Sequence, residues 1–452
     1  MLEQSTIAPK LAETDSNPAS QPDKPFNWRT CWYAIAFSAD LPSNHPYSFS
    51  IYGEPFVLFR DETGQLTCLE DRCPHRAAKL SDGQLLNGRI ECLYHGWQFG
   101  KEGTCLHVPQ LQDSAQMPAR AHAKSFAVVE DRGLIWVWAD EPETATRDRL
   151  PNLPELDQQN VFIVDTTTDF PFDHTFLVEN LLDPAHVYIS HDRTELKIRR
   201  EDAQPLEMEV LSTSVRGFQA RFRGVNRAQS PWTSLDFIAP HFVHYSFSNA
   251  AFGVVGGLAL YSLPLAPGKS RILVRRYGNF FKRPFTLKPR WLEHLRQNKI
   301  LEEDLRFIVE QQRYFERGDR ATKSVYFPLK TCDLFVMEHR KWLDRFGGNL
   351  PWYWGYETQK QPDRAIHTPE PNQLPNRFER HTQQCGSCSV VHRRMRQIQQ
   401  GGIVGAIAFL SLALIGEDTV RLIFALSFVL ACTTVGLAGQ LKTHFERSFT
   451  RS

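Results

Sequence analysis

The chain has 452 residues and a formal net charge of +1, so it is long enough for two to three domains with a sizeable core. A nearly neutral chain has no overall electrostatic attraction to nucleic acid, and we expect no nucleic-acid partner. Its nine cysteines are odd in number and irregularly spaced, which argues against a disulfide framework and favours a reducing compartment with metal-bound thiolates.

The N-terminal third predicts a disordered arm followed by a small all-β domain. Residues 1–25 are polar and contain no apolar stretch of the kind found in a signal peptide. Residues 26–145 consist of short apolar runs, such as 55–60 and 134–138, that are separated by turn signals.

The middle of the chain predicts an α+β domain over residues 155–375. A strand-like run at 271–277 is followed by a helical pattern at 291–317. Residues 376–400 are rich in Gln, Pro and Arg and predict a linker.

The C-terminal part predicts a membrane anchor over residues 401–440, followed by a tail at 441–452. Two apolar segments, 401–416 and 422–439, flank a short polar break. Each is slightly shorter than the roughly 20 residues that span a bilayer, so a re-entrant or interfacial hairpin is the alternative. Arginine and lysine lie before the first segment and after the second, which predicts that both ends face the cytoplasm or stroma.

The all-β region contains two mixed Cys–His pairs, Cys73-x-His75 and Cys92-x-x-His95. Two thiolates on one iron and two imidazoles on the other make a Rieske [2Fe–2S] centre. The alternative is a structural zinc site, but such sites usually pair Cys with Cys and His with His. The mixed pairs, with Gly-Trp-x-Phe after the second, favour the Rieske centre.

A second group of polar residues runs from Asn180 through Asp183 and His186 to His191 in an otherwise apolar stretch. Two imidazoles and a distant carboxylate are the ligands of a non-haem Fe(II) oxygenase site. In a helix, Asn180, Asp183 and His186 share one face. His191 would lie about 140° away from His186, so we expect a helix break or π-bulge between the two histidines.

The third ligand has to come from far along the chain, and Asp304 in the amphipathic helix pattern 301–312 is the best candidate. The pattern alone does not rank Asp304 above Glu303 or Asp333.

The segment before the apolar tail contains Cys385-Gly-Ser-Cys388. Vicinal thiols at this spacing can cycle as a disulfide, with thioredoxin as the partner and His381, His392 and Arg393 as activating neighbours. The alternatives are a partial zinc site or two idle thiols.

Together, the two His-containing motifs resemble the Rieske non-haem iron oxygenases over residues 26–345. The resemblance implies an α+β chain, with an all-β Rieske domain and a helix-grip-type catalytic domain built on an antiparallel sheet. It implies that Cys73, His75, Cys92 and His95 bind the cluster and that His186, His191 and Asp304 bind the mononuclear iron. Asp183 would carry electrons from His95 of a neighbouring subunit in a homotrimer, and Asn180 would lie just outside the ligands.

The Cys105 segment 103–110 and the Cys-x-x-Cys ahead of two membrane segments are similar to the pheophorbide a oxygenase branch, which includes the chloroplast-envelope translocon-associated Rieske protein and cyanobacterial relatives. This resemblance implies an O2-dependent oxygenase that acts on paired donors, with electrons from a ferredoxin-type protein and a bulky hydrophobic substrate. The implied substrate is a chlorophyll-derived tetrapyrrole such as pheophorbide a. The alternatives are a redox-sensing component of a membrane complex and an oxygenase of an aromatic or lipid substrate.

Overall fold

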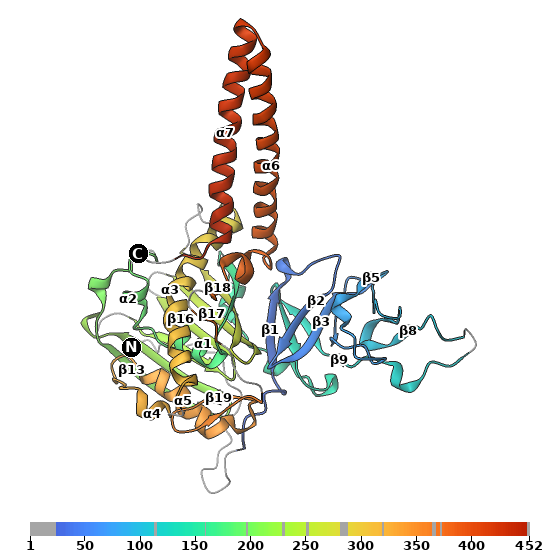
Figure 1. The fold of residues 1–452 in the computed structure, drawn as a ribbon. Coiled ribbons are helices and arrows are strands. Elements are labelled where there is room, and N and C mark those ends of the chain that lie inside the picture. The colour runs from blue at the N-terminus through green and yellow to red at the C-terminus, as the bar shows by residue number, and fades with distance from the viewer. Residues whose placement is uncertain are drawn as a thin grey trace.

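The protein is described by a computed structural model that covers residues 24–112, 115–158, 160–195, 198–227, 231–249, 253–280, 288–318, 321–363, 368–370 and 373–449. The disordered arm predicted for residues 1–25 lies almost entirely outside this range. The described chain forms an all-β lobe, a larger α+β lobe and a helical hairpin that projects from the second lobe (Figure 1).

The first lobe contains three antiparallel sheets, with strand orders β1-β11-β10, β2-β3-β4-β9 and β5-β6-β7-β8. The strands predicted at 55–60 and 134–138 are confirmed as β3 and β11. The third sheet lies at the end of the lobe that points away from the rest of the molecule (Figure 1). The strands are β1 (Trp32–Phe37), β2 (Tyr47–Ile51), β3 (Glu54–Arg60), β4 (Leu66–Glu70), β5 (Gln84–Leu86), β6 (Arg89–Glu91), β7 (Gln98–Phe99), β8 (Cys105–His107), β9 (Ser125–Phe126), β10 (Val128–Asp131) and β11 (Leu134–Trp138).

The second lobe is built on a seven-stranded antiparallel sheet with the order β12-β18-β17-β16-β15-β14-β13. Strands β13 to β18 form a meander, and β12 pairs with β18 at the edge. Its strands are β12 (Phe162–Phe170), β13 (Leu206–Ser214), β14 (Gly217–Gly224), β15 (Thr233–Ile238), β16 (Phe242–Asn249), β17 (Val254–Ala266) and β18 (Lys269–Gly278), and a separate hairpin consists of β19 (Tyr353–Trp354) and β20 (Gln359–Lys360).

Helices pack on this sheet and against one another, while β1 of the first lobe contacts β12, β17 and β18. Two hydrophobic clusters therefore contain buried residues of both lobes. The strand predicted at 271–277 and the helix predicted at 291–317 are confirmed as β18 and α3. The helices of this lobe are α1 (His174–Leu181), α2 (Val187–Ser190), α3 (Arg290–Glu316), α4 (Thr322–Val325) and α5 (Leu334–Phe346).

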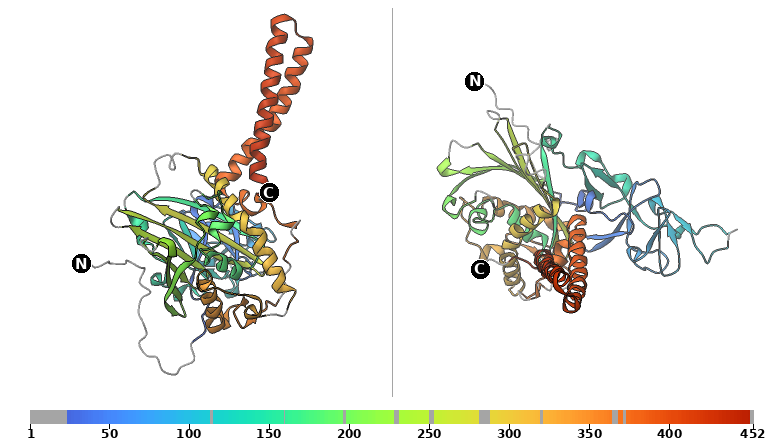
Figure 2. Two further views of the ribbon diagram at one scale, coloured as in Figure 1. Left: turned by 90° about the vertical axis from the view of Figure 1, so that its left-hand side faces the viewer. Right: turned by 90° about the horizontal axis from the view of Figure 1, so that it is seen from above.

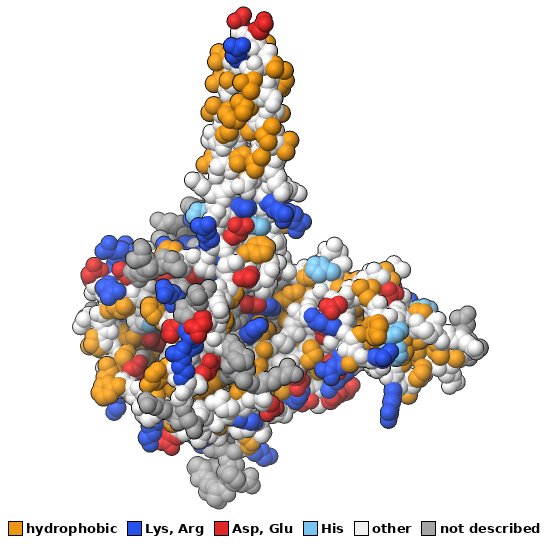
Figure 3. Space-filling view, viewed as in Figure 1, with side chains coloured by type: hydrophobic (Ala, Val, Ile, Leu, Met, Phe, Trp, Pro, Cys, Tyr) orange, Lys and Arg blue, Asp and Glu red, His pale blue; other side chains and the backbone are white. Residues whose placement is uncertain are grey.

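The hairpin consists of α6 (Gly386–Ile415) and α7 (Asp418–Glu446), which pack along each other and extend away from the body (Figure 2). Both are long and apolar enough to cross a membrane. Their apolar side chains point outward, as at Val404, which is 68% exposed, and Leu414, which is 73% exposed. Side chains of both charge signs lie at the tip, and Lys and Arg gather at the base (Figure 3).

The linker predicted for 376–400 is wrong. A π-helix occupies Phe378–Thr382, and α6 begins at Gly386. Arg377 and Arg380 are buried, and both pair with the buried carboxylate of Glu302 on α3, at 2.5 and 2.7 Å. This segment therefore fixes the base of the hairpin to the second lobe.

Candidate metal centres

The two Cys–His motifs form a pair of matching tight loops, the first between β4 and β5 and the second between β6 and β7. In the first loop, Cys73 O accepts from Ala77 N at 2.9 Å and Cys73 N donates to Ala78 O at 2.7 Å. In the second, Cys92 O accepts from Gly96 N at 2.8 Å and Cys92 N donates to Trp97 O at 2.9 Å. Each loop turns through a residue with positive φ, Ala77 at 58° and Gly96 at 74°.

These loops bring the four predicted cluster ligands to one tip of the lobe. Both cysteines are buried, whereas His75 is exposed and His95 is half-buried. The two imidazole rings lie 4.6 Å apart, and Trp97 stacks on His75 at 4.6 Å. Buried thiols beneath partly exposed imidazoles fit a [2Fe–2S] cluster whose histidine-bound iron faces outward.

The environment of the first thiol also fits a metal-bound thiolate. Burial raises the pKa of Cys73 to about 11, while the amide N–H groups of His75 and Arg76 act in the opposite direction by hydrogen-bonding to its sulfur. Metal binding would therefore have to drive the loss of the proton.

The second group of ligands converges in the α+β lobe. Donor atoms of His186, His191 and Asp304 all lie within 4.8 Å of one another. Asp304 Oδ2 is 3.4 Å from His186 Nε2 and 3.3 Å from His191 Nε2. We call these three residues the triad. Two imidazoles and one carboxylate that face a common point fit the donor set of a mononuclear iron.

The local backbone that presents the histidines differs from our prediction. Helix α1 ends at Leu181, upstream of Asp183, so Asn180, Asp183 and His186 do not share one helix face. Asp183 Oδ1 instead accepts from Ala185 N at 2.8 Å and His186 N at 3.3 Å and thereby starts a new turn. The helix is therefore broken before His186 rather than between the histidines, and α2 ends at Ser190, immediately before His191.

Two further side chains, Glu303 and Asn180, contact the triad in different ways. Glu303 lies behind His191 and its Oε2 is 3.0 Å from His191 Nδ1, while its other oxygen accepts from Thr194 Oγ1 at 2.6 Å. Asn180 Nδ2 donates to Asp304 Oδ2 at 3.4 Å. Asp304 therefore faces both histidines, whereas Glu303 contacts only His191. The sequence pattern could not make this distinction.

Electrostatics couple the members of the triad strongly. Burial lowers the pKa of His186, but Asp183 and Asp304 outweigh this effect and raise it to about 10. Burial opposes ionisation of Asp304, yet hydrogen bonds and charges from both histidines hold its pKa well below the usual range. The metal-free triad is thus a carboxylate paired with a protonated imidazole, and a metal ion would take the place of that proton.

A cavity of about 540 Å³ opens beside the triad. Its volume lies within the range of small-molecule sites. Asp183, His186 and Asp304 line one part of it, and residues of α3, α5 and the segment around Tyr326 line the rest. Two aromatic residues of its lining are strongly exposed, Phe307 at 69% and Phe327 at 90%.

A larger cavity of about 690 Å³ lies elsewhere, between the segment that precedes β1, residues 148–154 and strands β14 and β15. It contains none of the predicted ligands, and we therefore assign the reaction to the smaller cavity beside the triad.

The Cys-x-x-Cys motif is not displayed on the surface. Cys385 is 3% exposed and Cys388 is 0% exposed, so a protein such as thioredoxin cannot reach either sulfur in this conformation. Both thiols lie beside His381 and His294. His294 escaped the sequence analysis because it lies 91 residues before Cys385 and has no motif of its own.

An all-β lobe with paired Cys–His loops, joined to an antiparallel-sheet domain with a two-histidine, one-carboxylate triad, defines the Rieske non-haem iron oxygenases. Family models agree, because residues 31–127 match the Rieske [2Fe-2S] domain and residues 237–321 match the pheophorbide a oxygenase domain. The cofactors are accordingly a Rieske [2Fe–2S] cluster and a mononuclear iron.

Similarity to individual proteins narrows the assignment from the Rieske oxygenases as a whole to one branch of them. Protein TIC 55 of Arabidopsis thaliana is 35% identical over 86% of this chain and 77% of its own length. Pheophorbide a oxygenase of the same plant is 31% identical over 99% of this chain and 88% of its own length. Both are chloroplastic. The crystal structure of dicamba monooxygenase shares the fold, with a TM-score of 0.58 at 24% identity over 71% of this chain and 98% of that one. The chain belongs to the pheophorbide a oxygenase and TIC 55 branch of the Rieske oxygenases.

Proposed function

We propose that this chain is a membrane-anchored oxygenase of a chlorophyll-derived tetrapyrrole, pheophorbide a or a related catabolite. The observation that carries the proposal is the triad at the wall of a cavity of about 540 Å³, whose lining includes the exposed aromatic rings of Phe307 and Phe327. Exposed aromatic rings beside a metal site suit a large, flat and apolar substrate. Two of the relatives carry the name pheophorbide a oxygenase, which supports this substrate class.

The residues of the site would have distinct roles. His186, His191 and Asp304 hold the mononuclear iron, and Cys73, Cys92, His75 and His95 hold the cluster. When bound, the iron centres would relay electrons from the external donor and activate O2, chemistry that amino-acid side chains cannot supply. Glu303 fixes the ring of His191 through Nδ1, and Asn180 steadies Asp304. Phe307 and Phe327 hold the substrate over the triad and exclude water.

Electrons would pass between subunits of a homotrimer. In one chain, the loops at the tip of the β5–β8 sheet lie at the opposite end of the body from α2 (Figure 1). Leu93 and Tyr94, next to His95, are 61% and 59% exposed, as expected of a surface that a neighbouring chain or an electron donor covers. Asp183 is only partly buried, and its Oδ2 lies 3.4 Å from His186 Nδ1, so it is suited to link His95 of a neighbour to the triad.

The electron donor would be a ferredoxin-type protein, and the hairpin would hold the body at the cytoplasmic or stromal face of a membrane. Arg393, Arg394 and Arg396 lie at the base of α6, and Lys442 and Arg447 lie at the end of α7, which supports this orientation. The predicted thioredoxin partner is not part of the proposal, because both thiols are buried.

A redox-sensing component of a membrane complex is the competing function. A sensor needs no cavity at the mononuclear site, whereas the described residues offer three ligands at this triad, which borders a cavity. The geometry therefore favours turnover.

The decisive experiment uses the reduced, detergent-solubilised protein with ferredoxin, its reductase, 18O2 and a panel of chlorophyll catabolites. We expect labelled oxygen in one product, detected by mass, and none with Asp304→Ala. If the wild-type protein carries its full iron content but labels no product, the tetrapyrrole substrate is wrong.

The transfer between subunits has its own test. Chains with Cys92→Ser and chains with Asp304→Ala should each be inactive alone, and a co-expressed mixture should regain activity. A mixture that stays inactive, although mixed trimers are recovered through two affinity tags, would contradict the transfer between subunits.

A further inference from the structure

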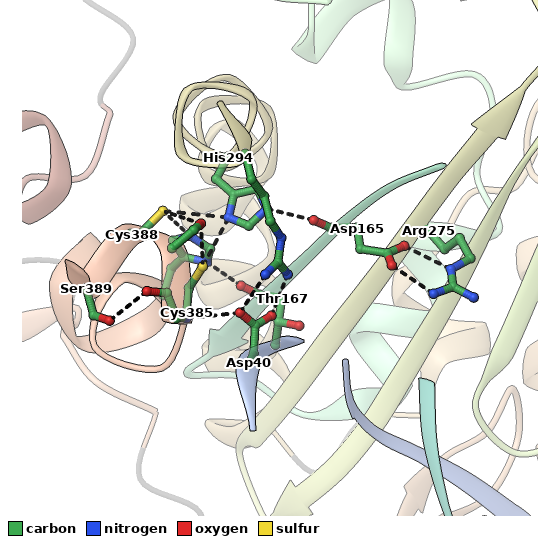
Figure 4. Close-up of polar contacts among 12 residues, drawn as sticks. Asp40, Asp165, Thr167, Arg275, His294, Cys385, Cys388 and Ser389 are labelled. Atoms are coloured by element: carbon green, nitrogen blue, oxygen red, sulfur yellow. Dashed lines mark hydrogen bonds and ion pairs between the residues drawn. The ribbon is translucent and has the colours of Figure 1, made fainter. Parts of the chain in front are cut away.

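Four buried side chains meet where the hairpin joins the α+β lobe. They come from separate elements: His294 from α3, His381 from the π-helix, Cys385 from the residue before α6 and Cys388 from its first turn (Figure 4). One donor atom from each lies within 4.8 Å of all the others. We call these residues the Cys2His2 cluster, and the proposed oxygenase reaction uses none of them.

The distances between these atoms match those around a tetrahedral metal ion. His294 Nδ1 lies 3.2 Å from Cys385 Sγ and 3.6 Å from Cys388 Sγ. His381 Nε2 lies 3.3 Å from Cys388 Sγ. With Zn–S near 2.3 Å and Zn–N near 2.0 Å, tetrahedral geometry separates neighbouring sulfur and nitrogen ligands by about 3.5 Å.

In each imidazole, the hydrogen-bond partner of the nitrogen that faces away from the thiols determines which nitrogen carries the proton. His294 Nε2 lies 2.7 Å from the carbonyl oxygen of Asp165, and His381 Nδ1 lies 2.5 Å from that of Thr167, both on β12. A carbonyl only accepts, so these nitrogens carry the protons, and the lone pairs of His294 Nδ1 and His381 Nε2 face the sulfur atoms. A metal-binding histidine typically has this arrangement of a backbone acceptor behind the ring.

The net charge of the cluster and its surroundings favours a divalent cation. Two thiolates with two neutral imidazoles carry −2, which a divalent ion neutralises. Nearby cations are already paired, since Arg290 binds Asp40 at 2.7 Å and Arg380 binds Glu302 at 2.7 Å. A disulfide between the thiols would instead remove the groups that face the two buried lone pairs, which is unfavourable.

We infer that His294, His381, Cys385 and Cys388 form a structural zinc(II) site. Four protein ligands and almost complete burial make it a closed site, without the open position of a catalytic metal. The ion would connect the start of α6 to α3 and lie against β12. Asp304 lies ten residues after His294 on α3, so the zinc site and the triad are about 15 Å apart along one helix.

The test is the metal content of the full chain, purified in detergent without chelators. We expect about one zinc per chain beside about three irons, two in the cluster and one in the triad. Cys388→Ser and His294→Ala should each lower zinc at least tenfold and leave the iron in place. Cys432→Ser, at an exposed position on α7, is the matched control and should keep its zinc.

A second measurement needs no variant and therefore does not depend on variant folding. X-ray absorption at the zinc edge of the wild-type protein should give two sulfur neighbours at about 2.3 Å and two nitrogen neighbours at about 2.0 Å. Zinc far below one per chain, with either free thiols or a Cys385–Cys388 disulfide by mass spectrometry, would overturn the site. The disulfide would point to a redox pair instead. The failure of this proposal is separable from a failure of the oxygenase assay, because metal content is read without turnover.

Discussion

The triad and the Cys2His2 cluster share helix α3 but differ in ligand number and surroundings. The triad has three ligands, a half-buried His186 and a cavity of about 540 Å³ at its side. The cluster has four ligands, and all four are buried. A site with three protein ligands and a cavity can admit reactants, whereas four ligands in a sealed core serve only to hold the chain together. The same helix thus supplies Asp304 to the proposed iron site and His294 to the proposed zinc site.

The largest expected effect comes from removing the carboxylate of the triad. Asp304→Ala should abolish oxygenation and lower iron from about three to about two atoms per chain, because the cluster keeps its own ligands. Glu310→Gln, at a 52% exposed side chain on the same helix, is the control and should change neither value. Iron analysis together with the cluster spectrum checks this, and an unchanged iron content in Asp304→Ala would contradict the ligand assignment.

Removing the group behind His191 should have the next largest effect. Glu303→Gln loses the carboxylate that lies 3.0 Å from His191 Nδ1. Loss of such a partner typically costs 10–100-fold in metal affinity or activity, so we expect a fall of about that size. Titration of the metal-free protein with Fe(II) under anaerobic conditions measures it. A wild-type affinity would show that the Glu303 carboxylate is not needed to orient the ring.

The triad should also bind iron with an affinity that depends on pH. Metal-free His186 has a pKa raised to about 10, so it is protonated at neutral pH and has to lose that proton when iron binds. Apparent affinity should therefore rise about tenfold per pH unit between about pH 6 and pH 8. Reconstitution with Fe(II) at several pH values, followed by iron analysis, tests the slope. A flat profile would mean that iron does not displace this proton.

The smallest effect is expected at Asn180. Its amide donates a long hydrogen bond of 3.4 Å to Asp304, and such a bond is worth about 1 kcal/mol, or about fivefold in rate. Asn180→Ala should retain the iron and lose activity by about that factor. A loss as large as that of Asp304→Ala would place Asn180 among the groups that hold the metal.

Sequence analysis was strongest where the chemistry is local. The cluster ligands come from two short loops, so their spacing alone indicated a Rieske centre. Asp304 and Glu303 are adjacent, and which of them faces the histidines depends on how α3 is rotated against the lobe, which no local pattern contains. His294 and Cys385 meet only through the tertiary fold. The linker prediction failed for the same reason, since the partner that buries Arg377 and Arg380 lies on α3.

Three consecutive acidic residues on α3 make three different sets of contacts. Glu302 pairs with the arginines at the hairpin base, Glu303 contacts His191 and Asp304 faces both histidines. Successive helical residues are rotated by about 100°, so one helix distributes these roles around its circumference. Insertion or deletion of a single residue between His294 and Glu302 would rotate all three at once. It would misalign both the contact of Glu302 with the hairpin base and the contacts of Glu303 and Asp304 at the triad, although every side chain would still be present. In this helix the spacing of residues is under as much constraint as their identity.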